Sequence, residues 1–336
     1  MRFPNVHHPD SRVGIMRSQS LKEVRYELVD VPEPFGPVEV CVDEAKVLTY
    51  AFAQGDFGSW YFHDSPFGGP VAHPLVLAND LLFLFYDGYD GNTAQGLHTH
   101  ETLRFRSPAK IDEKVTVTGA YTDKYERRGQ GYVVLEAEAR GEDGRVLVEH
   151  VGKEIMRTIA GDVAGRGATT AGERQRSVLG EADNSLPVAS VAADGLAPRT
   201  PIPSLSRSYT QDQMSAFSWA GKGYANVHTS AEKAAASGLP RTIVQAQQQT
   251  GLIVENMVAF FGASWFTDGH LDLRFISPVF LEDEISTTGA VIGERDGRLE
   301  LEVWIDKNDG TRTAVGWASA PVSQLPDRPA PLLRIH

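Results

Sequence analysis

Cysteine, positive charge and long apolar runs are all scarce in this chain of 336 residues, and each scarcity excludes a class of protein. The one cysteine, Cys41, rules out an internal disulfide and fits a reducing compartment. The net charge of −12 argues against binding to nucleic acid or to an anionic membrane surface. The longest apolar stretch, Val71–Tyr86, is interrupted by polar residues and is too short to span a bilayer.

Targeting and cofactor motifs are also missing. Residues 1–16 contain no apolar segment of the signal-peptide kind, so a cytoplasmic location is expected. The sequence has no glycine-rich phosphate loop followed by Lys-Ser/Thr and no dinucleotide fingerprint after a strand, so no cofactor is expected. An anionic substrate is not excluded, because Arg104, Arg106 and Arg274 could meet a phosphate, although they fit equally well as solvated strand residues.

An internal repeat organises the chain. Leu103–Ala120 and Leu273–Ala290 align without a gap, 170 residues apart, and each carries a Ser-Pro pair between two strand-like runs. Proline cannot donate to a sheet ladder, so each pair marks a bend between strands. The alternating runs Gly131–Ala139 and Arg298–Ile305 follow, each with a hairpin signal behind it.

The repeat predicts an α+β fold, a tandem double hotdog in which each unit is a long helix wrapped by an antiparallel sheet. The two units should pair through edge strands into one continuous sheet. We expect an N-terminal unit at 1–159, a linker rich in small residues at 160–205, and a C-terminal unit at 206–336. Part of so long a linker should pack on the surface, and the tail after Pro326 should be extended.

The second repeat also carries a family likeness. The chain resembles the MaoC-like (R)-specific enoyl-thioester hydratase/dehydratase family in its double-hotdog form. The spacing of 15 residues between His228 and Ile243 suits the family. The matching positions are Phe217-Ser218, Gly221, His228, Ala234 and the run Thr242–Ala246, which should open the long helix. The first half resembles the degenerate N-terminal domain of the family, with Tyr61 at the motif histidine and Pro74 at the helix start.

Two departures from the family pattern bear on the site. In the family an aspartate five residues before the histidine helps to bind and activate water. The second half has Gly223 at that position, and the first half keeps Asp56 but has Tyr61 in place of the histidine. The resemblance places the two equivalent positions at opposite ends of the sheet, so Asp56 is not expected to reach His228.

The resemblance implies a hydro-lyase that interconverts 3-hydroxyacyl and 2-enoyl thioesters of coenzyme A or a carrier protein. His228 would move the proton, and the Ala246 backbone N–H at a helix N-terminus would hold the thioester oxygen. The first half cannot offer that donor, because Pro74 has no N–H. Two alternatives stay open, a degenerate thioester-binding module and a specialised biosynthetic enzyme with another residue set. A homodimer is one option for assembly.

Further candidates surround this centre, each with a structural alternative. Asn226 could hold the water or cap a helix over 229–236. Gln245 could line the pocket or be only a first-turn residue. At least one of Gln247–Gln249 should face the cavity, because a buried amide needs a partner. Asp56 could act in catalysis or cap a turn. His63 could be an alternative acid/base or belong only to a turn. Tyr61 and Tyr224 could be pocket walls or belong to the core.

A metal-like spacing occurs once. His98, His100 and Glu101 lie in a strand-like run, and alternation predicts that His98 and His100 share a face. No fourth ligand stands out, so we expect no metal site.

Overall fold

The computed structural model describes residues 21–94, 96–158 and 180–322. Ten strands of these residues form one sheet in which all neighbours are antiparallel. In spatial order the strands are β2 (Glu33–Val42), β5 (Glu113–Arg127), β6 (Gln130–Gly141), β7 (Val146–Thr158), β4 (Leu97–Phe105), β9 (His270–Phe275), β12 (Arg312–Pro321), β11 (Arg298–Lys307), β10 (Glu284–Arg295) and β8 (Leu205–Ser208).

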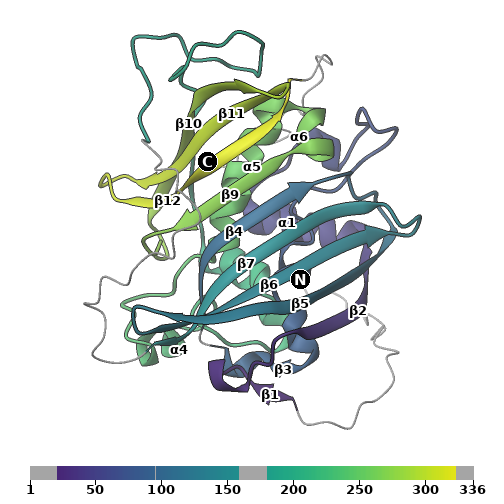
Figure 1. The fold of residues 1–336 in the computed structure, drawn as a ribbon, viewed down its shortest axis with the longest axis vertical. Coiled ribbons are helices and arrows are strands. Elements are labelled where there is room, and N and C mark those ends of the chain that lie inside the picture. Colours follow the sequence, from purple (N-terminus) through teal and green to yellow (C-terminus); the bar gives the residue numbers. More distant parts are fainter. Residues whose placement is uncertain (1–20, 95, 159–179, 323–336) are drawn as a thin grey trace, which may run out of the picture.

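The two halves of the sheet meet at β4 and β9 in the middle of the molecule (Figure 1). Leu103 lies opposite Leu271 across this junction, and both side chains are fully buried. The strand order is symmetric about the junction, since each half continues outward through its own three long strands to a final edge strand. The predicted continuous sheet, paired through edge strands, is therefore confirmed.

Helices cover one face of this sheet (Figure 1). None of them, in the part of the chain that the structure describes, is long and apolar enough to cross a membrane. The helices are α1 (Glu44–Gln54), α2 (Ala78–Leu82), α3 (Gln211–Phe217), α4 (Ala231–Ala236), α5 (Ala246–Phe261) and α6 (Ala263–Asp268); a small separate pair of strands is formed by β1 (Lys22–Glu23) and β3 (Tyr89–Asp90).

The long helix α5 is the centre of the second unit. Its apolar side chains, such as Leu252, Ile253 and Met257, are buried, each contributing about 1.5–3 kcal/mol on transfer from water. The sequence predicted a start near Thr242, but residues 242–245 are extended and Ile243 forms a β-bridge with Phe280. The backbone of this segment thereby pairs with Phe280 instead of continuing the helix, so α5 begins only at Ala246.

The first unit lacks the long helix that the repeat predicted. Its place is taken by the five-residue helix α2 and a 3-10 turn at Leu84–Asp87. Phe85 in this turn packs against Tyr121, with 5.9 Å between ring centroids, and Tyr121 packs against Phe35 at 5.1 Å. Aromatic residues are weak helix formers, and packing into this cluster competes with a straight helix. The expectation of a long helix in each copy is thus correct only for the second copy.

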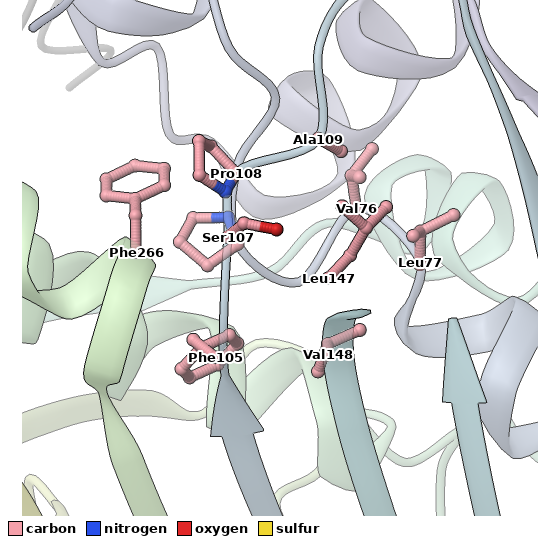
Figure 2. A pocket seen from close by; sticks show the side chains of 10 residues that line it. Val76, Leu77, Phe105, Ser107, Pro108, Ala109, Leu147, Val148 and Phe266 are labelled. Atoms are coloured by element: carbon pink, nitrogen blue, oxygen red, sulfur yellow. The ribbon is translucent and has the colours of Figure 1, made fainter. Parts of the chain in front are cut away.

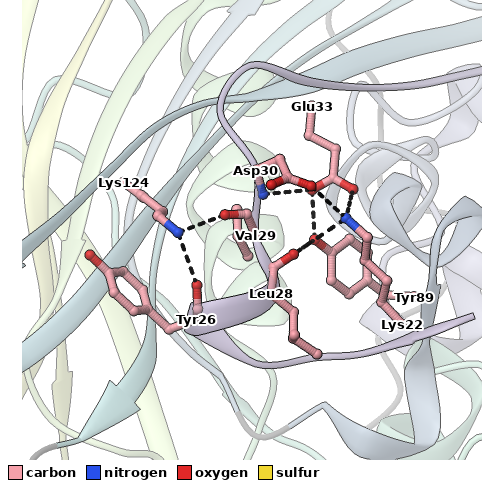
Figure 3. Close-up of polar contacts among 8 residues, drawn as sticks. All are labelled: Lys22, Tyr26, Leu28, Val29, Asp30, Glu33, Tyr89 and Lys124. Carbon is pink, nitrogen blue, oxygen red and sulfur yellow. Dashed lines mark hydrogen bonds and ion pairs between the residues drawn. The ribbon is translucent and has the colours of Figure 1, made fainter.

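The segment at 21–33 is held by polar contacts within itself and to the rest of the first unit (Figure 3). Lys22 Nζ lies 2.8 Å from Glu33 Oε1, and the Tyr89 hydroxyl donates to Glu33 Oε2 at 2.6 Å. Lys124 Nζ donates to the Val29 carbonyl oxygen at 2.6 Å. Val29 is itself buried, so this segment is part of the core of the unit.

The described part of the predicted linker packs on the second unit. The Ile202 N–H donates to the Gly289 carbonyl at 3.1 Å, and the Ala192 N–H donates to the Phe260 carbonyl at 2.9 Å. These bonds meet the expectation that part of the linker lies on the surface of the fold. Residues 160–179 and the tail after Pro326 lie outside the described residues, and the domain boundaries at 159 and 206 stay predictions.

Candidate active site

The loop between α3 and α4 holds His228 through a turn built by Asn226. The Asn226 Oδ1 atom accepts from the His228 backbone N–H at 2.9 Å, which is an Asx turn. The α4 helix is capped by Ser230, whose hydroxyl accepts from the Lys233 N–H at 3.3 Å. The structure therefore gives the capping role considered for Asn226 to Ser230, and it makes Asn226 the residue that shapes the backbone of His228. A catalytic role for Asn226 stays a prediction.

The imidazole of His228 is oriented by a backbone carbonyl. Its Nδ1 atom lies 2.8 Å from the Ile243 oxygen. A carbonyl oxygen can only accept, so Nδ1 carries the proton and Nε2 keeps its lone pair. Burial lowers the pKa of His228 below its ordinary value, against the opposing effect of the bond to Ile243. The ring is thus neutral near pH 7, with Nε2 ready to accept a proton.

The N-terminus of α5 lies three residues beyond Ile243. Gln245 is the N-cap residue and its side chain makes no capping bond to the first turn. The first backbone N–H groups of an α-helix have no partner within the helix, and they carry partial positive charge. Ala246, the first helical residue, is partly exposed. Because Ile243 fixes the ring of His228, a proton acceptor and an open helix N-terminus are held within one short segment.

The Gln245 side chain lies in a buried polar chain that joins the two units. Its Oε1 atom accepts from the Ser218 hydroxyl at 2.7 Å, and its Nε2 atom donates to Asn79 Oδ1 at 2.8 Å. The Asn79 amide in turn donates to the Phe217 carbonyl. All three of these polar side chains are buried. The contacts anchor the start of α5 to the first unit, and a substrate-binding role for Gln245 stays a prediction.

Gly223 occupies the position of the missing aspartate. Its φ is +85°, a left-handed conformation that favours glycine, and a Cβ atom added there would meet no atom of the described residues within 4 Å. This geometry agrees with a relaxed turn and with extra room at the site.

Asp56 is buried among residues of the first unit. Its Oδ1 atom accepts from the Gly58 N–H at 3.1 Å, and its Oδ2 atom accepts from the Tyr61 hydroxyl at 3.1 Å. His73 Nε2 lies 3.5 Å from Oδ2, and His73 Nδ1 accepts from the Leu75 N–H at 3.0 Å. Tyr61, expected as a pocket wall, is thus a buried partner of Asp56. His73 joins these two side chains.

Two charged residues that the sequence analysis did not single out lie near Asp56. Arg207 NH2 lies 3.0 Å from Glu255 Oε2, and its other terminal nitrogen donates to the Gln54 carbonyl. Burial raises the pKa of Asp56 to about 6, which Arg207 opposes. Burial, with the charge of Asp56, raises the pKa of Glu255 to about 8. The cluster combines β8 and α5 of the second unit with the first unit, a juxtaposition that no local motif reveals.

Pro74, where the sequence predicted a helix start, lies instead in a turn before α2, which begins at Ala78, and has little room beside it. A cavity of about 10 Å³ lies next to Pro74, lined mainly by apolar side chains such as Val76, Phe105 and Phe266 (Figure 2). That volume holds at most about one water molecule. Pro74 also lacks the N–H that would receive a thioester oxygen.

The two remaining sequence candidates lie in different surroundings. His63 is exposed and follows the 3-10 turn Ser59–Tyr61, with its N–H donating to the Ser59 carbonyl at 2.8 Å. Tyr224 belongs to the loop that carries His228, and its ring packs on Tyr86 of the first unit at 5.0 Å. Tyr224 therefore lies where the loop meets the first unit, while His63 lies on the surface.

A β-bulge in β4 separates the two histidines that alternation placed on one face. The register shifts between His98 and His100. His100 Nε2 reaches Asp272 Oδ2 at 3.1 Å, whereas the His98 ring lies 6.1 Å from that of His150 and 5.5 Å from that of Phe275. The prediction of a shared face is wrong, because the extra residue of the bulge reverses the alternation.

Glu101 pairs with α5 on the inner face of the sheet. It accepts from Gln247 Nε2 at 2.9 Å and from the Thr250 hydroxyl at 2.6 Å. Gln248 donates to the Ala53 carbonyl at 3.2 Å. The polar run in α5 is therefore explained in part by partners on the sheet and on α1. Burial opposes ionisation of Glu101, but His150, the charge of His98 and Thr250 lower its pKa to about 2.

Comparison with known proteins shows which sequences and folds this chain is similar to. Residues 195–311 match the family model described as MaoC like domain. No curated protein matches the sequence. A structure named MaoC-like dehydratase has 14% identity and a TM-score of 0.64, and the match covers 89% of this chain and 100% of that one. A Mycobacterium tuberculosis protein described as a double hotdog fold has 14% identity and a TM-score of 0.59, with 88% and 98% covered.

A third similar structure is the full-length peroxisomal multifunctional enzyme type 2 from Drosophila melanogaster. It has 16% identity and a TM-score of 0.59, with 86% of this chain and 48% of that one covered. Identities this low establish the fold alone. The chain is a double-hotdog protein, as the repeat predicted. Residues 195–311 in its second half are similar to the MaoC-like domain, in agreement with the family likeness read from residues 217–246.

Proposed function

We propose that the protein is a hydro-lyase that interconverts 3-hydroxyacyl and 2-enoyl thioesters at the site formed by His228 and the N-terminus of α5. The observation that carries the proposal is the 2.8 Å contact between His228 Nδ1 and the Ile243 oxygen, which leaves Nε2 as a base and ties the ring to the segment that leads into α5. The match of residues 195–311 to a MaoC-like domain supports the reaction class.

The reaction needs one proton acceptor and one stabiliser of negative charge. In dehydration, His228 Nε2 takes the proton from the α-carbon, and that electron pair forms the new C=C bond. The hydroxyl group leaves from the β-carbon and takes the proton back from the imidazolium, so that water departs and the ring returns to its neutral form. The thioester oxygen, negative in the enolate-like state, accepts from the Ala246 N–H. Such a donor contributes roughly 3 kcal/mol to acyl chemistry.

This scheme assigns both proton transfers to His228 because Gly223 offers no carboxylate. The carrier would be coenzyme A or an acyl carrier protein. Asp56, buried with Tyr61 and His73, would act in the architecture of the first unit rather than on this substrate.

The test is turnover of a panel of enoyl thioesters of different chain length. His228→Ala should abolish hydration, while His63→Ala, an exposed histidine of the first unit, should leave it unchanged. If His228→Ala hydrates the panel at close to the wild-type rate, the assignment is wrong.

Gly223 also supports one second function, a thioester-binding module without turnover. That function would be indicated by saturable binding of acyl thioesters to the wild-type protein with no turnover of any member of the panel.

A further inference from the structure

We propose that His98, Glu101 and His150 form a binding site for one divalent transition-metal cation of the zinc type. One ligand atom from each of the three residues lies within 4.8 Å of the others. The site lies between the inner face of β4 and β7 and the first turn of α5. It is separate from His228 and does not depend on the proposed reaction.

One pair of donors already has the spacing of a coordination sphere. His150 Nε2 lies 3.2 Å from Glu101 Oε1. In a tetrahedral zinc site with bonds of about 2.0–2.1 Å, neighbouring ligand atoms are roughly 3.3 Å apart. Two histidines and one glutamate are also a donor set that zinc uses in proteins.

Unsatisfied polar atoms point to the same place. Among the described residues, neither ring nitrogen of His98 or of His150 has a hydrogen-bond partner, and Gln247 Oε1 has none either. The ion-pair contacts of these rings are at 3.7 Å to Glu154 and at 3.2 Å to Glu101. His150 is only 1% exposed, and Glu101 is fully buried. Buried imidazole nitrogens nearly always have a partner, so such a concentration needs an explanation. A cation would satisfy one nitrogen on each ring, and its fourth ligand would be water or Gln247 Oε1.

Charge and outer contacts complete the arrangement. His98 Nδ1 lies 3.7 Å from Glu154 Oε1, which leaves His98 Nε2 for the metal in the common carboxylate–histidine–metal pattern. Glu101 and Glu154 together would balance the double charge of the ion. Thr250 and Gln247 hold Glu101 in place from α5, so the ion would join the start of that helix to the sheet.

The test measures metal binding by the full chain after treatment with a chelator. His7, His8 and His336 are first replaced by alanine in a background chain, so that terminal histidines cannot bind the metal. Titration with Co²⁺ should give one equivalent bound per chain with the visible spectrum of a four-coordinate ion, displaced by Zn²⁺. Zn²⁺ should also raise the Tm of the background chain.

Variants then locate the ion. His150→Gln and Glu101→Gln should each weaken binding at least 100-fold, and Glu154→Gln should weaken it about 10-fold. His100→Gln is the matched control, because His100 lies on the same strand but faces Asp272 on the other side of the sheet. The proposal is overturned if the background chain binds no Co²⁺, or shows only the spectrum of the hydrated ion. Equal weakening of metal binding by His100→Gln and His150→Gln would also overturn it. The two results on the background chain do not depend on whether any of these variants folds.

Discussion

The Nδ1 atom of His228 donates to the carbonyl oxygen of Ile243 across 2.8 Å, and this bond fixes both the tautomer and the position of the ring. Ile243 is itself held by a β-bridge to Phe280, and α5 begins three residues later. The base is therefore held by the segment that leads into the helix N-terminus, which is the arrangement on which the proposed reaction depends.

The pH dependence of turnover should follow the titration of His228. Burial lowers the pKa of this group below the ordinary value, and only the neutral ring can accept the α-proton. We expect kcat/KM for dehydration to fall only on the acid side, where the ring becomes charged, with a midpoint below the ordinary histidine value of about 6.5. A pH–rate profile checks this. A fall in rate that begins well above pH 7 would contradict a neutral His228 as the base.

Restoring the carboxylate at position 223 should improve catalysis. A side chain there meets open space, although its left-handed backbone should cost about 1–2 kcal/mol of stability for a residue other than glycine. We expect Gly223→Asp to raise kcat, by about 10-fold, because a second group then shares the proton transfers. The matched control is Gly221→Asp, in the same loop, also open and without a positive φ. The same rate for both variants would show that position 223 has no special place in the site.

Stability should fall with increasing pH because of the cluster around Asp56. The pKa values of Asp56 and Glu255 are raised in the folded state, to about 6 and about 8. These two carboxyl groups therefore bind more protons in the folded protein than in the unfolded chain between roughly pH 4 and pH 8, and they favour folding at the lower end of that range. The buried histidines His73 and His228, whose pKa values are lowered, act in the opposite direction below about pH 6.5, so the effect is measured above that pH. Thermal unfolding should show Tm decreasing from pH 7 to pH 8.

The Glu255→Gln variant isolates the contribution of Glu255 to this slope. It should flatten the decrease in Tm, although it also removes a partner of Arg207 and lowers Tm throughout. Glu232→Gln, an exposed site on α4, should leave the slope unchanged. A wild-type Tm that rises steadily across this range would contradict the raised pKa values.

The tie between Gln245 and Asn79 should be important for stability. Gln245→Ala leaves the Asn79 and Ser218 side chains buried without these partners, at a cost of about 1–3 kcal/mol for each unsatisfied group. Chemical denaturation measures the loss. Asn79→Ala and the double variant complete a cycle, in which strong coupling is expected. Additive effects of the two substitutions would show that the contact contributes little.

Much of the architecture could be predicted because its signals are local. The Ser-Pro pairs at 107 and 277 mark bends, and the alternating runs after them become β6 and β11. The shortened helix of the first unit could not be predicted in this way. It depends on Phe85 packing against Tyr121, which comes from a strand far along the chain.

The same contrast applies to the site. The spacing of His228 from Ile243 indicated a functional histidine. The tautomer of this histidine depends on the extended backbone of residues 242–245, which were predicted to be helical. The grouping of His98 with His150 depends on a bulge in β4 and on a neighbouring strand. Single-sequence alternation detects neither, because both arise from strand pairing.

The most direct measurement is a crystal structure of His228→Gln with a bound enoyl thioester. We predict that the thioester oxygen lies within hydrogen-bonding distance of the Ala246 N–H, with the β-carbon facing residue 228. A thioester bound instead beside Pro74, with residue 228 pointing into solvent, would contradict the account.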